Sequence, residues 1–316
     1  MSVVDKTVVI TGANAGIGYE VALTLSKQGA KIVMACRSMD KAEQARNDLL
    51  TEVPNAKIDI IPLDVSELPS INEFVRRFKD QFGSLDILVN NAGIVTPNLS
   101  RNSIGYELHL ATNYLGAYAL TGLMLPMFNP SQPTRIVNVG SLAHRFGKFD
   151  FNDPNYDRKK FNHWRAYAQS KIATAAFTQE LSRRLRLAGS KTIALGAHPG
   201  FAATDMGRKT GATTPKTKFG QWYQGKLEAW IVGKPENAAL PIIYAVTKEQ
   251  VDGGDYYGPN GLFEIKGMPG PAKVNPLAKN IEFGKRLWAA SEALTGVSYL
   301  TAEESLSATA TDTTIN

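Results

Sequence analysis

A glycine-rich turn near the start of the chain limits the fold more than any other feature. The β-branched run Thr7–Ile10 ends at Thr11, and the pattern Gly12-x3-Gly16-x-Gly18 then leads into a helical pattern over residues 19–28. Glycines permit a tight turn, and the free N–H groups at a helix start bind anions such as a pyrophosphate. This strand–turn–helix order predicts a dinucleotide-binding unit, with a purely structural turn as the alternative.

The same alternation continues along the chain. Apolar strands are predicted at residues 31–36, 58–63, 86–89, 135–139 and 192–195, with one short strand at 262–265. Helices are predicted at 38–51, 66–82 with Ser66 as N-cap, 103–127, 164–188, 235–247 and 277–294. Strands that are apolar on both sides and alternate with helices are typical of a doubly wound parallel α/β sheet, the Rossmann type. We therefore expect a single domain over residues 1–298, with a helical lid at about 200–235 and a flexible tail at 299–316.

Composition narrows the class of protein. The 316 residues are 43% hydrophobic and 20% charged, which is ordinary for a globular protein. The net charge of +6 comes from scattered Lys and Arg, so it argues against a nucleic-acid interface and favours an anionic ligand such as a phosphorylated cofactor. The single cysteine, Cys36, fits a reducing compartment. No apolar run reaches the ~18 residues of a membrane span, so a cytoplasmic location is expected.

Several segments that follow the strands are candidates for cofactor binding. An acidic residue at the end of the second strand would bind the ribose of NAD, whereas Arg37 stands there and suits the 2′-phosphate of NADP. The sequence therefore favours NADP(H) over NAD(H). Asp64 either accepts from the adenine amino group or caps the next helix. In Asn90-Asn91-Ala92-Gly93, small residues let the backbone lie along the cofactor, and the Asn side chains can tie adjacent strands.

The pentapeptide Tyr167-Ala168-Gln169-Ser170-Lys171 is the candidate catalytic motif. Tyr167 and Lys171 fall one helical turn apart, so the ammonium is expected to lower the pKa of the phenol. Such a phenol exchanges a proton with an alcohol or carbonyl oxygen, although an ordinary solvated pair is the alternative. Ser141, just past the fifth strand, can hold that oxygen. Asn113 either bends its helix and holds a water leading to Lys171, or is a tolerated surface residue.

Taken together, these motifs resemble the short-chain dehydrogenase/reductase family over about residues 5–250. The resemblance implies a catalytic set of Ser141, Tyr167, Lys171 and Asn113, with Lys171 also on the nicotinamide ribose. It implies that the segment after Pro199-Gly200 closes over the substrate, with Thr204 near the cofactor. The predicted cofactor contacts are Gly12, Asn14, Ala15, Gly16, Ile17, Gly18, Arg37, Ser38, Asp64, Val65, Asn91, Ala92, Gly93, Tyr167, Lys171, Pro199, Gly200 and Thr204. Family members pair through the helices predicted at 103–127 and 164–188, so a homo-oligomer is expected unless the C-terminal extension blocks a contact.

Finer features resemble the retinol dehydrogenase/protochlorophyllide reductase-like branch. They are Ala35-Cys36-Arg37, the run 138–144, the run 253–259, and the 26-residue gap between Ser141 and Tyr167. Gly140 departs from that branch, which often has a second Ser there. The hydrophobic N-terminal anchor of the membrane-bound retinol enzymes is also missing, which favours a soluble relative, and the resemblance alone does not imply retinoid activity.

Two further groups of side chains have both a functional and a structural interpretation. His144 and His163 flank the segment 145–163, and we expect satisfied or surface histidines rather than a metal site. Trp222, Tyr223 and Trp230 either line an apolar substrate pocket or pack beneath a helix.

The predicted function is an NADP(H)-dependent oxidoreductase that interconverts an alcohol and a carbonyl on an apolar small molecule. The alternatives are a light-dependent tetrapyrrole reductase, an NADP-sensing binding protein without turnover, and a sugar-nucleotide epimerase or dehydratase. The spacing of Gly12, Gly16 and Gly18 counts against the last of these.

Overall fold

A computed structural model describes residues 1–200 and 234–301. Within these ranges the chain forms one eight-stranded sheet in the order β3-β2-β1-β4-β5-β6-β7-β8. Strands β1 to β7 pair in parallel, and β8 runs antiparallel to β7. The strands are β1 (Thr7–Thr11), β2 (Lys31–Cys36), β3 (Lys57–Pro62), β4 (Ile87–Asn90), β5 (Thr134–Val139), β6 (Thr192–Ala197), β7 (Tyr256–Pro259) and β8 (Pro269–Pro271). This confirms the predicted doubly wound α/β fold, whose strand order reverses between β1 and β4.

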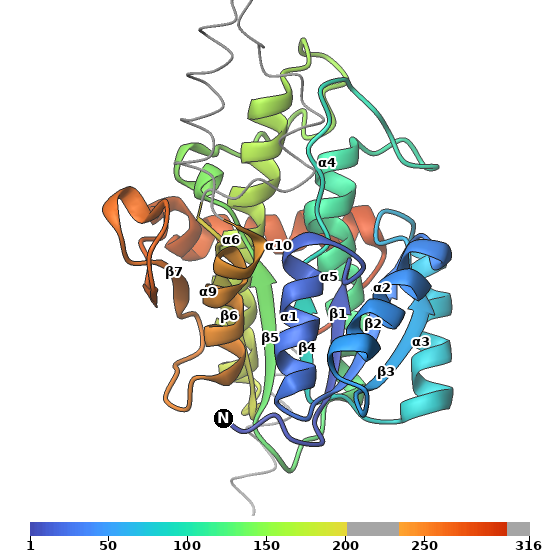
Figure 1. Cartoon of the computed structure of the whole chain (residues 1–316). Coiled ribbons are helices and arrows are strands. Elements are labelled where there is room, and N and C mark those ends of the chain that lie inside the picture. The colour runs from blue at the N-terminus through green and yellow to red at the C-terminus, as the bar shows by residue number, and fades with distance from the viewer. Residues whose placement is uncertain (201–233, 302–316) are drawn as a thin grey trace, which may run out of the picture.

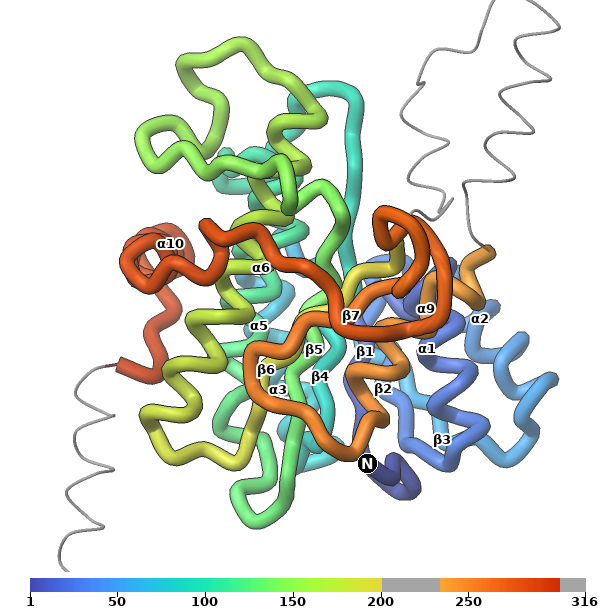
Figure 2. The backbone as a smooth tube through the Cα atoms, turned by 90° about the vertical axis from the view of Figure 1, so that its left-hand side faces the viewer, coloured from blue at the N-terminus to red at the C-terminus, as the bar shows by residue number. Residues whose placement is uncertain are grey.

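Helices cover both faces of the sheet (Figures 1 and 2). One face is covered by α1 (Gly16–Lys27), α2 (Met39–Glu52) and α9 (Pro235–Thr247), and the other by α3 (Leu68–Phe82), α5 (Gly116–Met124) and α6 (His163–Leu187), with α10 (Ile281–Thr295) packed outside these helices. The central strands are therefore buried on both sides, and Val8, Val9 and Ile10 have no exposed surface. This burial explains their continuous β-branched run.

The helix predicted at 103–127 begins five residues later. It consists of α4 (Leu108–Leu110), a π-helical turn (Ala111–Leu115), α5 and a final 3-10 turn (Leu125–Met127). The carboxylate of Glu107 accepts from the N–H groups of His109 and Leu110 and so sets the start. The π-helical turn includes Asn113.

Two other local predictions were wrong. Ser66 is not the N-cap of α3, because its N–H and hydroxyl donate to Asp64 and the helix begins after Glu67. Residues 262–265 do not form a strand, since Phe263 and Glu264 have φ of 54° and 59°. Leu262–Glu264 instead forms a kinked 3-10 segment in which Phe263 is not helical. A residue with positive φ cannot continue a strand.

The C-terminal region packs across α5 and α6. Trp288 of α10 is 1% exposed, and its ring centroid lies 5.1 Å from that of Tyr118 and 4.7 Å from that of Tyr299. Tyr299, at the start of the predicted tail, is thus part of the core. Figure 2 shows α10 outside α5 and α6, so this face of the two helices is covered by the chain itself.

Candidate active site

Helix α6 places Tyr167 and Lys171 at the carboxyl end of β5. The ammonium of Lys171 donates to the carbonyl oxygen of Val139 at 2.9 Å and lies 5.9 Å from the centre of the Tyr167 ring. Lys171 is 5% exposed, and burial lowers its pKa to about 8. The predicted pair is therefore present, but its lysine is buried rather than solvated.

Ser141 and Tyr167 come together although they lie on different elements. The hydroxyl of Ser141 caps a 3-10 turn (Leu142–Phe146) by accepting from the N–H of Ala143 at 3.2 Å, and it lies near the hydroxyl of Tyr167. Burial of the phenol raises the pKa of Tyr167, and the nearby Ser141 hydroxyl only partly offsets this effect. The predicted lowering of this pKa by Lys171 was therefore wrong for the chain alone.

Asn113 is buried and is not a surface residue. Its side-chain oxygen accepts from the N–H of Ile94 at 2.7 Å, and its amide donates to the carbonyl of Ile94 and the hydroxyl of Ser170, each at 3.0 Å. Its own carbonyl accepts from the hydroxyl of Thr174 at 3.0 Å. The predicted bend takes the form of the π-helical turn, and the residue joins α6 to the segment after β4.

The glycine-rich turn has the geometry of an anion site. Gly12 and Gly16 have φ of 66° and 56°, and a Cβ on Gly18 would lie 2.5 Å from both Asn91 Nδ2 and the Gly12 carbonyl oxygen. No side chain caps the start of α1 and no acidic residue stands in its first turn. These N–H groups therefore suit a pyrophosphate, as they do in nucleotide-binding helices. The other predicted contacts here, Asn14, Ala15 and Ile17, lie in the turn and at the start of α1.

The segment after β4 is tied to this turn. The hydroxyl oxygen of Thr11 accepts from the N–H groups of Asn91 and Ala92 at 2.9 and 2.8 Å, and Asn91 Nδ2 donates to the Thr11 carbonyl at 2.8 Å. The amide of Asn90 donates to the Asn138 side chain of β5 at 2.9 Å. The predicted tie between adjacent strands is confirmed. Gly93 lies close to the candidate catalytic residues, since a Cβ there would lie 3.3 Å from Asn113 Oδ1 and 3.6 Å from Lys171 Nζ.

The end of β2 presents a basic side chain. Arg37 is 72% exposed, and its guanidinium lies 3.6 Å from the carboxylate of Asp64, which is held in turn by Ser66. An exposed pair at that distance contributes little stability, so Arg37 is available to an anionic ligand. Ser38 precedes α2 with a hydroxyl that makes no capping bond, and Val65 is buried beside Asp64.

Beyond β6, Pro199 and Gly200 begin the segment predicted to cover the substrate. Gly200 has φ of 73°, and its N–H donates to His198 Nδ1 at 3.1 Å. Thr204, the aromatic residues Trp222, Tyr223 and Trp230, and nearly all of the proposed lid lie outside the described residues.

Sequence reasoning missed two buried histidines and a buried tyrosine. His109 and Glu107 have no exposed surface, and His109 Nδ1 lies 2.6 Å from the Glu107 carboxylate. The ring of His109 packs edge-on against that of Tyr167, with the two centroids 6.3 Å apart. His198 Nε2 lies 3.0 Å from the Glu264 carboxylate. The tyrosine is Tyr256 of β7. The Glu-x-His spacing at a helix start could have indicated the buried His109, and the unusual Gly140 could have indicated a bulky neighbour such as Tyr256.

His144 is a satisfied histidine, as predicted. It has no exposed surface, and its ring nitrogens face the carbonyl oxygens of Ser141 and Lys273. His163 begins α6 and is half-buried. Among the described residues no group of His, Cys, Asp and Glu has the arrangement of a metal site.

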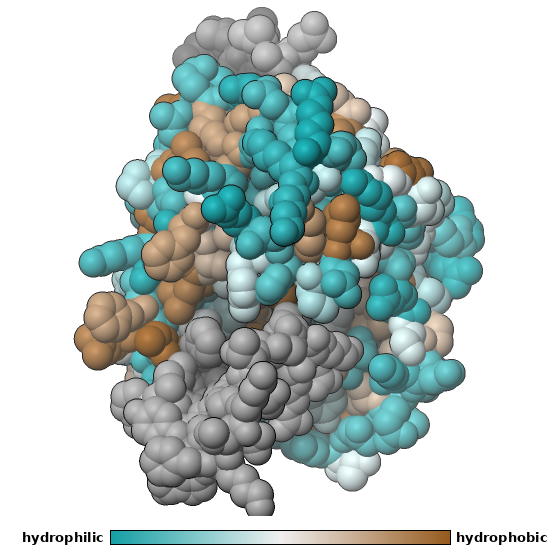
Figure 3. Space-filling view, turned by 90° about the horizontal axis from the view of Figure 1, so that it is seen from above, coloured by the Kyte–Doolittle hydropathy of each residue, from teal (hydrophilic) through white to brown (hydrophobic). Residues whose placement is uncertain are grey.

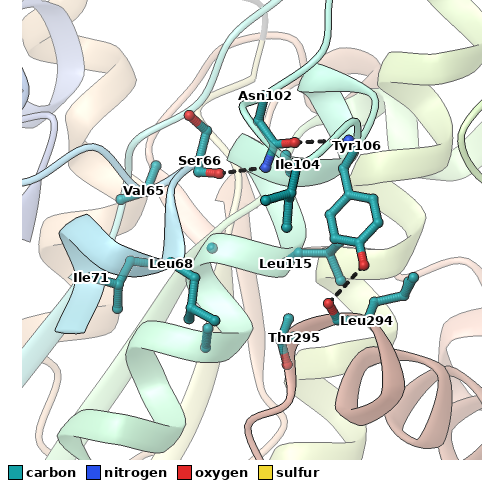
Figure 4. Close-up of a pocket in the computed structure, with 13 residues that line it drawn as sticks. Val65, Ser66, Leu68, Ile71, Asn102, Ile104, Tyr106, Leu115, Leu294 and Thr295 are labelled. Carbon is teal, nitrogen blue, oxygen red and sulfur yellow. Dashed lines mark hydrogen bonds between the residues drawn. The ribbon is translucent and has the colours of Figure 1, made fainter.

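Figure 4 shows a small cavity whose lining includes none of the candidate catalytic side chains. Its walls include Val65 and Leu68 on one side and Tyr106 and Leu294 on the other, and its volume is about 30 Å³. That space holds a water or two, not an organic substrate.

Comparisons with known proteins agree with this geometry. Residues 6–215 match the family described as short chain dehydrogenase. Human Retinol dehydrogenase 13 is 41% identical over 298 residues, covering 92% of this chain and 85% of that protein. Human Retinol dehydrogenase 11 is 34% identical over 295 residues, covering 92% of this chain and 86% of that protein.

Two solved structures have the same fold. A crystal structure of an uncharacterized protein from Mycobacterium paratuberculosis has a TM-score of 0.76 and 33% identity, covering 94% of this chain and 96% of the other. A crystal structure of an actinorhodin polyketide ketoreductase variant with NADPH has a TM-score of 0.61 and 22% identity, covering 77% of this chain and 91% of the other. The glycine turn, the Ser–Tyr–Lys geometry and these matches lead to one conclusion: the chain belongs to the short-chain dehydrogenase/reductase family and is related to the retinol dehydrogenases.

Proposed function

We propose that this protein is an NADP(H)-dependent oxidoreductase that interconverts an alcohol and a carbonyl on an apolar substrate. The observation that carries the proposal is the grouping of Ser141 and Tyr167 beside a lysine that is anchored to the end of β5 and lies 5.9 Å from the Tyr167 ring centre. A nicotinamide dinucleotide, when bound, supplies the hydride that exchanges with the substrate carbon. The uncapped start of α1 would hold its pyrophosphate, and Arg37 would hold the 2′-phosphate.

The protein's own residues handle the oxygen and its proton. Ser141 orients the substrate oxygen, and Tyr167 transfers the proton to or from it. The raised pKa of Tyr167 keeps the phenol protonated near neutral pH, which suits donation to a carbonyl and hence the reductive direction. Lys171 would contact the nicotinamide ribose, as the family resemblance implies, and Asn113 holds the adjoining segment in place.

An apolar substrate is supported by two observations. Phe146 and Phe263 are 84% and 71% exposed and follow the carboxyl ends of β5 and β7. Viewed from above, apolar side chains stand among hydrophilic ones on this end of the molecule (Figure 3). The names of the related retinol dehydrogenases add retinoids to the classes worth testing.

In the part of the chain that the structure describes, no helix has the length and apolar character to cross a bilayer.

The proposed function is tested by binding and turnover together. Nicotinamide fluorescence of the purified protein titrated with NADPH and NADH gives both dissociation constants. Apolar aldehydes, retinal among them, are then offered with the preferred nucleotide and followed by loss of absorbance of the reduced nicotinamide. Tight NADPH binding with turnover supports the proposal. Binding without turnover of any aldehyde, ketone or alcohol points to the NADP-sensing alternative instead.

A further inference from the structure

A buried hydroxyl without a partner lies beside the catalytic residues. Tyr256, the first residue of β7, is 5% exposed, and among the described residues nothing accepts from or donates to its hydroxyl oxygen. Buried polar groups are nearly always hydrogen-bonded, because an unpaired one costs folding free energy. A hydroxyl kept in this state therefore needs an explanation.

Two glycines make room for this side chain. A Cβ on Gly196, the β6 residue paired with Tyr256, would lie 2.1 Å from the tyrosine ring. A Cβ on Gly140 would lie 1.9 Å from the hydroxyl oxygen itself. Real Cβ atoms do not approach other atoms so closely, so any larger residue at either position would move the ring. Gly140, the departure noted in the sequence, is thus required by the position of the Tyr256 hydroxyl.

The position of this hydroxyl is next to the proton-transfer groups. Gly140 immediately precedes Ser141, whose hydroxyl lies near Tyr167, and Tyr167 is itself close enough to Tyr256 to affect its pKa. The Tyr256 ring packs against the rings of His144 and His198, with centroids 5.2 and 5.9 Å away. His198 in turn directly precedes Pro199 and Gly200, the last described residues before the predicted lid.

The neighbouring histidines do not pair with the hydroxyl. The ring nitrogens of His144 face two carbonyl oxygens, and those of His198 face the Gly200 N–H and the Glu264 carboxylate. Burial raises the pKa of Tyr256 well above the ordinary value, and the nearby Tyr167 raises it further. The phenol therefore stays protonated and acts as a donor that has no acceptor in the chain around it.

We propose that the Tyr256 hydroxyl donates a hydrogen bond to a carbonyl-type oxygen that the bound molecules bring to the catalytic centre. This rests on the proposed function. Two oxygens have the required chemistry, the carboxamide oxygen of the nicotinamide and the carbonyl oxygen of the substrate. Either oxygen would accept from the buried hydroxyl. A bound molecule that supplies such an oxygen therefore removes the cost of the unpaired donor and binds more tightly than one that does not.

The test is Tyr256→Phe, which removes only the hydroxyl. Three quantities are measured: the melting temperature of the ligand-free protein, the Kd for NADPH by fluorescence, and kcat and KM. The melting temperature should stay the same or rise, because no hydrogen bond is lost. A roughly tenfold weaker NADPH Kd identifies the carboxamide as the acceptor. An unchanged Kd with a roughly tenfold lower kcat/KM identifies the substrate oxygen.

Tyr257→Phe is the matched control. Tyr257 is the next residue, contributes to the core on the opposite face of the sheet, and donates to the Asp255 carboxylate at 2.6 Å. Its loss should lower the melting temperature and leave the NADPH Kd and kcat/KM unchanged. Tyr256→Phe with Kd and kcat/KM both within twofold of the wild type would overturn the proposal, as would a fall in its melting temperature. A wild-type protein without turnover refutes the proposed function, whereas the NADPH arm still tests the Tyr256 donor.

Discussion

The ammonium of Lys171 donates to the carbonyl oxygen of Val139 at 2.9 Å, and this contact joins α6 to the end of β5, just before Ser141. Val139 is the last residue of β5, and Ser141 follows two residues later. This hydrogen bond therefore holds the flexible side chain of Lys171 in one position, close to Ser141. Tyr167, one turn earlier on α6, shares this support.

Lys171→Met should remove a pH dependence of stability. The folded pKa of Lys171 is about 8, below the ordinary value near 10.4, so between these pH values the unfolded chain binds a proton that the folded chain does not. The free energy of unfolding therefore rises with pH in this window, by at most about 1.4 kcal/mol per pH unit from this group. Urea unfolding between pH 8 and 10 measures the difference in slope between variant and wild type. Lys285→Met, at a half-exposed lysine, should keep the wild-type slope; equal slopes in all three would refute the assignment.

Arg37→Ala should weaken NADPH binding by about 10- to 100-fold and leave NADH binding unchanged, because a guanidinium contacts the 2′-phosphate that only NADPH carries. Fluorescence titration with both nucleotides is the measurement. Arg76→Ala is the control, since Arg76 is similarly exposed and, among the described residues, pairs with Glu73 and Asp80 of its own helix. A parallel loss of NADPH and NADH affinity would contradict the assignment of Arg37.

Gly140→Ala should destabilise the protein, by about 1–3 kcal/mol, because its Cβ collides with the Tyr256 hydroxyl. Adding Tyr256→Phe should recover part of that loss, since the nearest ring carbon lies 3.1 Å from the new Cβ. Urea unfolding of the two single variants and the double variant gives the coupling energy. Strictly additive effects would show that the two residues do not meet.

Trp288→Ala should cost about 3–5 kcal/mol of unfolding free energy, because it removes a buried ring from the contact of α10 with Tyr118 and Tyr299. Trp164→Ala, at a 54% exposed tryptophan, should change stability by less than about 0.5 kcal/mol. Denaturant unfolding compares the two. Equal effects would mean that the C-terminal region adds little to the core.

Strands β1 to β6 were predictable because they depend on local patterns, whereas the short strands β7 and β8 were not predicted. Buried parallel strands read as apolar runs, and glycines mark the turn at β1. Contacts made by distant residues left no such pattern. Glu264 illustrates this: its carboxylate pairs with Arg145 and His198 and accepts from the Lys273 N–H, and this network accompanies the positive φ that prevents the predicted strand.

The burial of Asn113 and Tyr256 could not be predicted from the sequence either. A polar residue in a helix usually faces solvent, and only the fold brings Ile94 and Ser170 to Asn113. The pKa of Tyr167 was mispredicted because the charge of Lys171 was considered and the burial of the phenol was not. NADP preference, the cytoplasmic location, the single-domain boundaries and the subunit count remain predictions.

Turnover by Tyr167→Phe tests the central claim most directly. Phenylalanine keeps the ring and removes the hydroxyl proposed to transfer the proton, so kcat for an apolar aldehyde should fall by about 10²–10⁴-fold. The NADPH Kd, measured on the same preparation, should stay within a fewfold of the wild type because the glycine turn and Arg37 are untouched. A variant that binds NADPH normally and retains wild-type turnover would show that Tyr167 is not the proton donor.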